Sequence, residues 1–203
     1  MTTTAFRLGR VLLERQRAEC CRVLAAVPPE APTLCEGWRA RDLAAHLDAL
    51  CRDPLSWPGM AIPALRPGTR RRSAALVARL GYAGLVRRLR TRSPWMPLFG
   101  VDPIQGWRHH LGEWYVHTED VRRANAQPSA AHDPDLAEAL WQRVLAAAPI
   151  VRRHDPRGLI LRHTDGRAAT VLRRPDPVSI TGEPGELMVH VYRGRAAQVA
   201  VKG

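Results

Sequence analysis

The stretch HHLGEWYVHTEDVRRA, residues 109–124, decides the fold, because it places polar residues at helical spacing among aromatic and apolar ones. On a helix that turns 100° per residue, four of its polar side chains fall within an arc of about 80° and form one stripe. The stripe consists of His110, Glu113, His117 and Asp120. One interpretation is a solvent-facing stripe, since polar pairs at i and i+4 are common on helix surfaces.

The residues beside the stripe favour a second interpretation. Apolar side chains straddle it, which indicates that at least its edges are buried, and buried Glu and His are costly unless they are paired or bound to a cation. The flanking residues are Trp107, Trp114, Val116 and Val121. The stripe therefore predicts either a metal site or a tight hydrogen-bond network.

A metal site needs a third ligand from elsewhere in the chain. Glu113 and His117, at i and i+4, reach a common point and suit zinc. One helix supplies only part of a site, and the obvious neighbour is His46, on the helix expected after the sequence TLCEGW. Two histidines and one carboxylate would leave a position open for water or substrate.

Apolar residues at helical spacing continue on both sides of this stretch up to Pro149. We expect Ser73 to cap one helix and Asp133 another, and the proline-rich passage before residue 69 to be irregular. The expected helices cover about residues 6–27, 40–52, 73–91, 103–125 and 133–148.

After Pro149 the pattern changes from helix to short strands. Two β-rich runs flank TDGR, which is a hairpin signal, and DPVSITG reads as a third strand. A short helix closed by Gly194 and a terminal strand in AAQVAVKG follow. The fold class is therefore α+β: a helical unit at 1–148 and a small α/β unit at 149–203.

The charge is strongly positive but comes almost entirely from arginine. The net charge is +12, and Lys202 is the one lysine. This bias is typical of GC-rich coding sequences, so charge alone decides little. Arg66 to Arg92 holds nine arginines and no acid; it is either a solvated helix face or a surface for phosphate or an anionic small molecule.

Cysteine usage and hydropathy point to the cytoplasm. The four cysteines, at positions 20, 21, 35 and 51, show neither a C-x-x-C pair nor a disulfide framework. No stretch approaches the roughly 20 apolar residues of a membrane span. Arg and Glu occur too close to the first residue for a secretory signal. We expect a reduced cytoplasmic protein that does not enter a membrane.

Three segments carry a resemblance to a known family. TLCEGWRARDLAAHL, EWYVHTEDVRRA and ITGEPGELMVHVYRGR occur in the order found in the mycothiol-dependent maleylpyruvate isomerase family, part of the DinB/YfiT-like metal-binding superfamily. The chain resembles most an actinobacterial subgroup of similar length that is described only as metal-binding. The helical and C-terminal parts look short for the isomerase itself.

This resemblance implies an up-down-down-up four-helix bundle with a divalent metal, usually zinc, and a small α/β domain similar to sterol-carrier proteins. It places the ligands on His46, Glu113 and His117. Asp120 would support the site from behind, by orienting a ligand or by pairing with Arg122 or Arg123. His110 has no counterpart and stays a weak candidate.

The resemblance also implies thiol chemistry, in which mycothiol adds to the substrate as a thiolate and is expelled after bond rotation. Arg193 or Arg195 could bind an anionic cofactor or substrate, or could be surface arginines that close a helix.

Three functions stay open: a zinc- and thiol-dependent transferase or isomerase for a small electrophile, a non-catalytic metal- and ligand-binding protein, and, ranked last, a nucleic-acid binder without a recognised motif. A homodimer is one assembly that the sequence leaves open.

Overall fold

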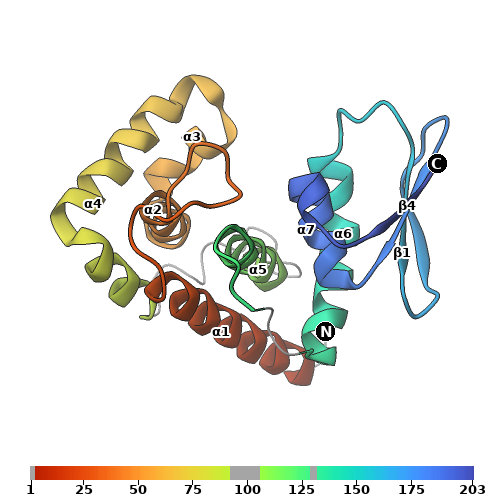
Figure 1. The fold of residues 1–203 in the computed structure, drawn as a ribbon, viewed down its shortest axis with the longest axis horizontal. Coiled ribbons are helices and arrows are strands. Elements are labelled where there is room, and N and C mark those ends of the chain that lie inside the picture. Colours follow the sequence, from red (N-terminus) through yellow and green to blue (C-terminus); the bar gives the residue numbers. More distant parts are fainter. Residues whose placement is uncertain (1–2, 92–105, 129–131) are drawn as a thin grey trace.

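The computed structural model describes residues 3–91, 106–128 and 132–203. The predicted α+β class is confirmed, because helices make up most of the chain and a four-stranded sheet lies near its C-terminal end (Figure 1). No helix in these ranges has the length and apolar character to cross a membrane. The α-helices are α1 Thr3–Ala25, α2 Ala40–Arg52, α3 Trp57–Ala61, α4 Arg66–Leu89, α5 Gly106–Ala124, α6 Pro134–Val151 and α7 Pro184–Arg193.

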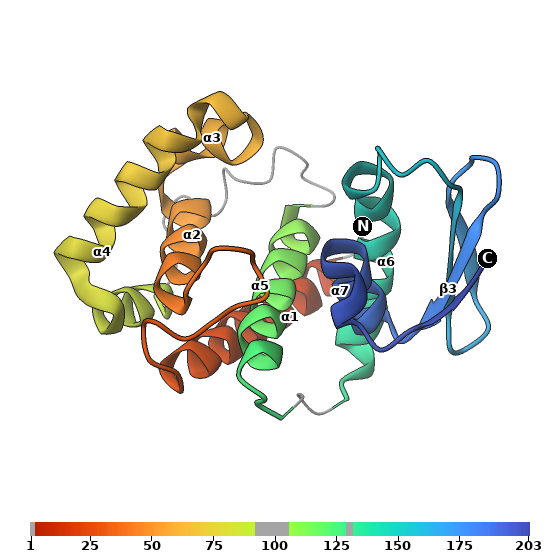
Figure 2. The same cartoon turned by 45° about the horizontal axis from the view of Figure 1, so that its top comes forward.

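Helix α5 lies at the centre of the molecule. It packs along α1 and also contacts α2, α6 and α7, while α2 packs against α4 (Figures 1 and 2). The apolar faces of α1, α2, α4 and α5 share one core, in which Leu47, Leu85 and Trp114 are almost completely buried. Burying these faces is the main favourable term for the helical part. The polar stripe of α5 is thereby held between α2 on one side and α7 on the other.

The sheet has the strand order β2-β1-β3-β4. Strands β1 and β2 form the predicted antiparallel hairpin, with Gly166 in its turn at a φ of 97°. Strand β3 runs parallel to β1, with Leu161 opposite Ile180, and antiparallel to β4. The strands are β1 Leu159–His163, β2 Ala168–Leu172, β3 Val178–Gly182 and β4 Ala200–Lys202.

Helices α6 and α7 lie between α5 and the sheet (Figures 1 and 2). Leu140 and Val144 of α6 and Leu187 of α7 share a second core with Leu161 and Ile180 of the sheet. Ala139, one residue before Leu140, belongs instead to the core of the helical part. Helix α6 thus contributes to both cores, and the domain boundary at residues 148/149 stays a prediction.

Two helix-end predictions are confirmed. The Asp133 side chain accepts hydrogen bonds from the backbone N–H groups of Asp135 and Leu136, which satisfies two of the free donors at the start of α6. Gly194 ends α7 with a φ of 58°, a conformation that L-residues with a side chain rarely adopt. Both signals are local, which explains why the sequence predicts them well.

The predictions around the prolines were wrong. The passage expected to be irregular forms the 3-10 helices η1 Pro54–Ser56 and η2 Pro63–Leu65 and the short helix α3, and α4 begins at Arg66 rather than at Ser73. Each of these segments has a proline at its first or second position, where the missing N–H is not needed and φ is already helical. Helix α6 continues past Pro149 to Val151. The helix start expected at Pro103 lies outside the described residues.

Gly81 breaks α4 in its middle and lets the helix bend round α2 (Figure 1). Its φ of 64° and ψ of 167° lie in a region open essentially only to glycine. We expect Gly81→Ala to lower the free energy of unfolding by about 1–3 kcal/mol. Gly68→Ala in the same helix, where a Cβ meets open space, should raise it by about 0.5–1 kcal/mol. Urea unfolding measures the free energy of both variants. A change of the same sign in both would contradict the special backbone conformation of Gly81.

Candidate metal centre

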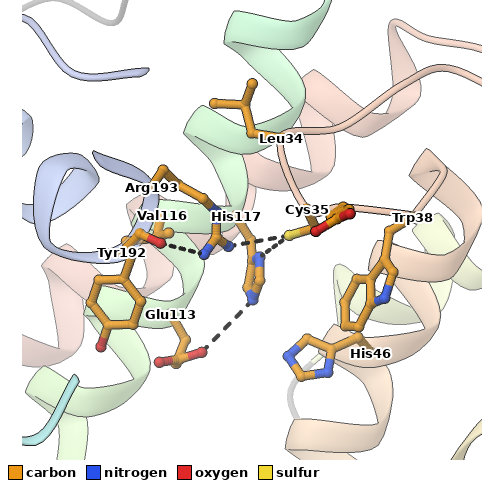
Figure 3. A pocket seen from close by; sticks show the side chains of 10 residues that line it. Leu34, Cys35, Trp38, His46, Glu113, Val116, His117, Tyr192 and Arg193 are labelled. Carbon is orange, nitrogen blue, oxygen red and sulfur yellow. Dashed lines mark hydrogen bonds and ion pairs between the residues drawn. The ribbon is translucent and has the colours of Figure 1, made fainter. Parts of the chain in front are cut away.

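A cavity of about 480 Å³ opens between α2, α5, α7 and the loop that precedes α2 (Figure 3). Glu113 and His117 project into it from α5 and His46 from α2. Trp38 and Tyr192 form aromatic parts of its wall. The cavity has the size of a small-molecule site.

The structure brings together the three residues that the sequence predicts as metal ligands. One nitrogen or oxygen atom from each of His46, Glu113 and His117 lies within 4.8 Å of the other two. The Nε2 atom of His117 is 3.7 Å from Oε2 of Glu113, and the rings of His46 and His117 meet edge to face with centroids 5.0 Å apart. One cation could contact all three groups after small side-chain rotations.

Asp120 fixes the orientation of His117 from behind. Its Oδ2 atom lies 2.9 Å from Nδ1 of His117, so this carboxylate holds the proton on Nδ1 and leaves Nε2 toward the cavity. Burial lowers the pKa of His117, but the hydrogen bonds to Asp120 and Cys35, together with the charges of Asp120 and Glu113, outweigh burial and raise this pKa to about 10. The same carboxylate would favour a metal cation that replaces the proton on Nε2.

Arg193 in turn fixes Asp120. Its Nε and Nη2 atoms donate to the two carboxylate oxygens at 2.6 Å each, and the Cys35 thiol donates to Oδ2 at 3.1 Å. Burial raises the pKa of Asp120, but the hydrogen bonds from His117 and Arg193 outweigh it and lower this pKa to about 2. Asp120 is therefore a carboxylate with no free oxygen.

His46 has the opposite environment. Burial, with a smaller contribution from the nearby His117, lowers the pKa of His46 to about 3, so its ring is neutral. Its ring nitrogens make no hydrogen bond to any described residue, although the ring packs on Trp38 with centroids 4.9 Å apart. A neutral imidazole with a free lone pair is the form that binds metal.

A second group of possible ligands shares His117. Atoms of Cys35, His117 and Asp120 also lie within 4.8 Å of one another. Here His117 Nδ1 already bonds to Asp120, and both oxygens of Asp120 accept hydrogen bonds from Arg193. A cation at this position would have to displace those bonds, so the geometry favours the group that contains His46 and Glu113.

Sequence reasoning missed the contributions of Cys35 and Trp38. Both lie in the loop before α2, within the TLCEGW segment that carries the family resemblance, but that resemblance assigns neither residue a role. The loop is held to α5 by the backbone hydrogen bond from Leu34 N–H to the Asp120 carbonyl. This contact places the Cys35 thiol against Asp120 and Arg193.

Three further predictions concern residues near the site. Asp120 does not pair with Arg122 or Arg123, because its partners are His117 and Arg193. His110 is buried beside His109, away from the cavity lining, and burial lowers its pKa to about 4. The side chain of Arg195, the other arginine suggested for an anion, lies outside those described.

Comparisons with known proteins find structures that share the fold of this chain. No family model and no curated protein matches the sequence. The crystal structure of the mycothiol-dependent maleylpyruvate isomerase matches with a TM-score of 0.63 and 18% identity, over 99% of this chain and 95% of that one. The chain has the fold of that isomerase. A structure of a histidine-to-alanine mutant of the isomerase matches with a TM-score of 0.62, 19% identity and the same coverage.

The predicted resemblance is therefore confirmed for the fold. The match spans nearly the whole of both chains, so it includes the helical part and the C-terminal α/β part together. At this level of identity it shows the fold but neither the reaction nor the substrate. Those have to be argued from the site.

Proposed function

We propose that this protein binds a divalent metal, zinc by preference, through His46, Glu113 and His117, and that it is a thiol-dependent transferase or isomerase for a small electrophile. The observation that carries the proposal is the convergence of three ligand atoms within 4.8 Å at the wall of an open cavity. The fold, shared with a mycothiol-dependent isomerase, supports the same class of chemistry. Mycothiol, or another low-molecular-weight thiol, is the proposed cofactor.

The chemistry of the three side chains fits zinc. Zinc accepts imidazole nitrogen and carboxylate oxygen together, and three protein ligands leave a coordination position for an exogenous molecule. His46 is neutral and free to coordinate, and His117 has a carboxylate behind it, as most metal-binding histidines have. The adjoining cavity supports an open, catalytic site rather than a closed structural one.

When bound, the metal would stabilise the anion of a thiol or of water by Coulomb attraction and so supply a nucleophile near neutral pH. Asp120 would hold the proton on Nδ1 of His117 throughout, since Arg193 and His117 together fix both of its oxygens. Arg193 donates to Asp120 and to the Tyr192 carbonyl, which supports positioning rather than direct contact with an anion. Trp38, Val116 and Tyr192 would exclude water from the reacting groups.

Metal analysis of protein purified without added zinc tests the proposal first. We expect about one divalent ion per chain and, with that ion in place, conjugation of mycothiol to small electrophiles, because the open position adjoins the cavity. Elemental analysis and a thiol-consumption assay measure the two properties. Protein stripped by a chelator is the control and should regain activity with zinc. Absence of metal would remove the enzyme hypothesis.

The alternative is a non-catalytic metal- and ligand-binding protein. It would show full metal occupancy but no thiol consumption with a range of electrophiles. The open cavity beside His117 favours the enzyme. The cytoplasmic location, the bundle topology, the sterol-carrier-like character of the last domain and a homodimeric state stay predictions.

A further inference from the structure

A second cavity, of about 370 Å³, lies on the side of α2 that faces α4. Its lining comes from the last turns of α2, from η1 and from both halves of α4. None of these residues lines the cavity of the candidate metal centre. The bend at Gly81 lets the two halves of α4 curve round α2 (Figure 1), and both halves contribute residues to the lining of this cavity.

Arginine dominates the charge of this second cavity. Four guanidinium groups and two carboxylates line it, which leaves two positive charges in excess. Arg72 and Arg79 precede the bend in α4 and Arg88 follows it, so a straight α4 could not bring all three to one cavity wall. The fourth, Arg52, comes from the last turn of α2.

The two carboxylates are already engaged. Asp48, 2% exposed, accepts from Nε of Arg88 at 2.8 Å and lies 3.3 Å from Nε of Arg52. Asp53 accepts from the Ser56 hydroxyl at 2.6 Å and from the backbone N–H of Leu55. Neither carboxylate can therefore fully neutralise the charge of another arginine.

The remaining arginines are less well paired. Arg72 approaches Asp53 only to 3.9 Å, and within the described part of the chain Arg79 has no acidic partner. Burial lowers the pKa of Arg52; Asp48 opposes this shift, and the nearby Arg88, whose positive charge crowds that of Arg52, adds to it. An anion in the cavity would relieve this crowding.

We propose that the cavity between α2 and the bent α4 binds a doubly charged oxyanion, the phosphate group of a small molecule, through the exposed Arg72 and Arg79, with Arg52 and Arg88 also in its lining. Guanidinium groups form planar pairs of N–H donors that match phosphate oxygens. The cavity volume exceeds that of phosphate alone and leaves space for the rest of a small phosphate ester.

The concave shape favours a small molecule over a nucleic acid. A duplex would need a row of exposed cations along a surface, whereas Asp48 and Arg52 in the lining of this cavity have side chains that are only 3% and 12% exposed. This assigns a specific role to part of the basic segment 66–92, of which residue 92 lies outside the described range.

The test is calorimetric titration of the full-length protein with inorganic phosphate and with pyrophosphate at constant ionic strength. We expect saturable binding by the wild type and about tenfold or greater weakening in Arg79→Gln and in Arg72→Gln, since each loses a charge-assisted hydrogen bond. Arg71→Gln is the matched control, because Arg71 is an exposed arginine of α4 that does not line the cavity. Its affinity should equal that of the wild type.

A second control separates this cavity from the metal centre. His117→Ala should bind phosphate as the wild type does; binding that is lost there and kept in Arg79→Gln would place the anion at the metal centre and overturn the proposal. Equal weakening in Arg71→Gln and Arg79→Gln would show general surface charge and also overturn it. So would tight binding of duplex DNA that depends equally on Arg71 and Arg79, or no phosphate binding at all.

Discussion

Replacing His117 by alanine is expected to weaken metal binding by more than about 100-fold, since loss of an outer partner of a ligand alone costs 10–100-fold. The imidazole lies between Glu113 and His46 and holds its Nε2 atom toward both. Without it, two ligands on separate helices remain. Elemental analysis after dialysis, together with competition against a chromogenic chelator, measures the loss.

Loss of metal in His117→Ala would not by itself decide which ligand group is used, because His117 belongs to both. Glu113→Gln and Cys35→Ser separate them. We expect Glu113→Gln to lose metal nearly as completely as His117→Ala, because the Glu113 carboxylate approaches His117 only to 3.7 Å and is available to a cation. Cys35→Ser should keep the metal, because the Cys35 thiol is already bonded to Asp120. The reverse result would move the metal to the group of Cys35 and Asp120.

His154→Ala is the matched control for this series. His154 is an exposed histidine of the turn after α6 that does not line the cavity, and its removal takes away the same chemical group. It should leave metal content and thiol consumption unchanged. Circular dichroism of each variant shows whether the helices persist, and a folded His117→Ala variant with full metal content would exclude this residue as a ligand.

Local periodicity predicts one side of the candidate site. The i, i+4 spacing of Glu113 and His117 is a property of α5 alone, and any helix there presents both on one face. His46 required an assumption about which helix packs next to α5. The structure supports that choice, as α2 contacts α5 and His46 meets His117.

The remaining contacts of the site depend on tertiary structure. Arg193 lies 73 residues after Asp120 in the chain and reaches it because α7 packs against α5. Cys35 reaches Asp120 because an irregular loop folds back on the same helix. Neither contact has a periodic signal, so the sequence suggested the neighbouring Arg122 or Arg123 as the partner of Asp120.

The fold shows the same division between local and distant causes. Asp133 and Gly194 act on their own helix ends and are predicted correctly. The prolines before α4 were read as helix breakers, although each begins a new helical segment. Proline has both effects, and only the packing of α3 and α4 decides between them.

Replacing Glu119 by glutamine is expected to lower the free energy of unfolding by about 3 kcal/mol, because it breaks a buried ion pair on one side only. Glu119 is 4% exposed and bonds to Arg122, which is 2% exposed, and to Arg123. Arg122 also pairs with Glu19 of α1, and Arg123 with Glu186 of α7. The charge network therefore connects α5 to both of its neighbours.

Urea unfolding measures this loss, with Glu138→Gln as the control. Glu138 also pairs with an arginine, Arg167, but its side chain is 49% exposed, so water screens the pair and stability should change little. A Glu119→Gln variant as stable as Glu138→Gln would contradict a structural role for the network.

The double variant Glu119→Leu with Arg122→Met shows where the energy arises. If most of the loss in Glu119→Gln comes from leaving the Arg122 guanidinium short of a buried counter-charge, removing both charges should restore part of the stability. Glu19, with 26% of its side chain exposed and a second partner in Arg22, can lose Arg122 and remain hydrated. If the double variant loses more free energy of unfolding than the two corresponding single variants together, the ion pairs themselves hold α1 and α7 against α5.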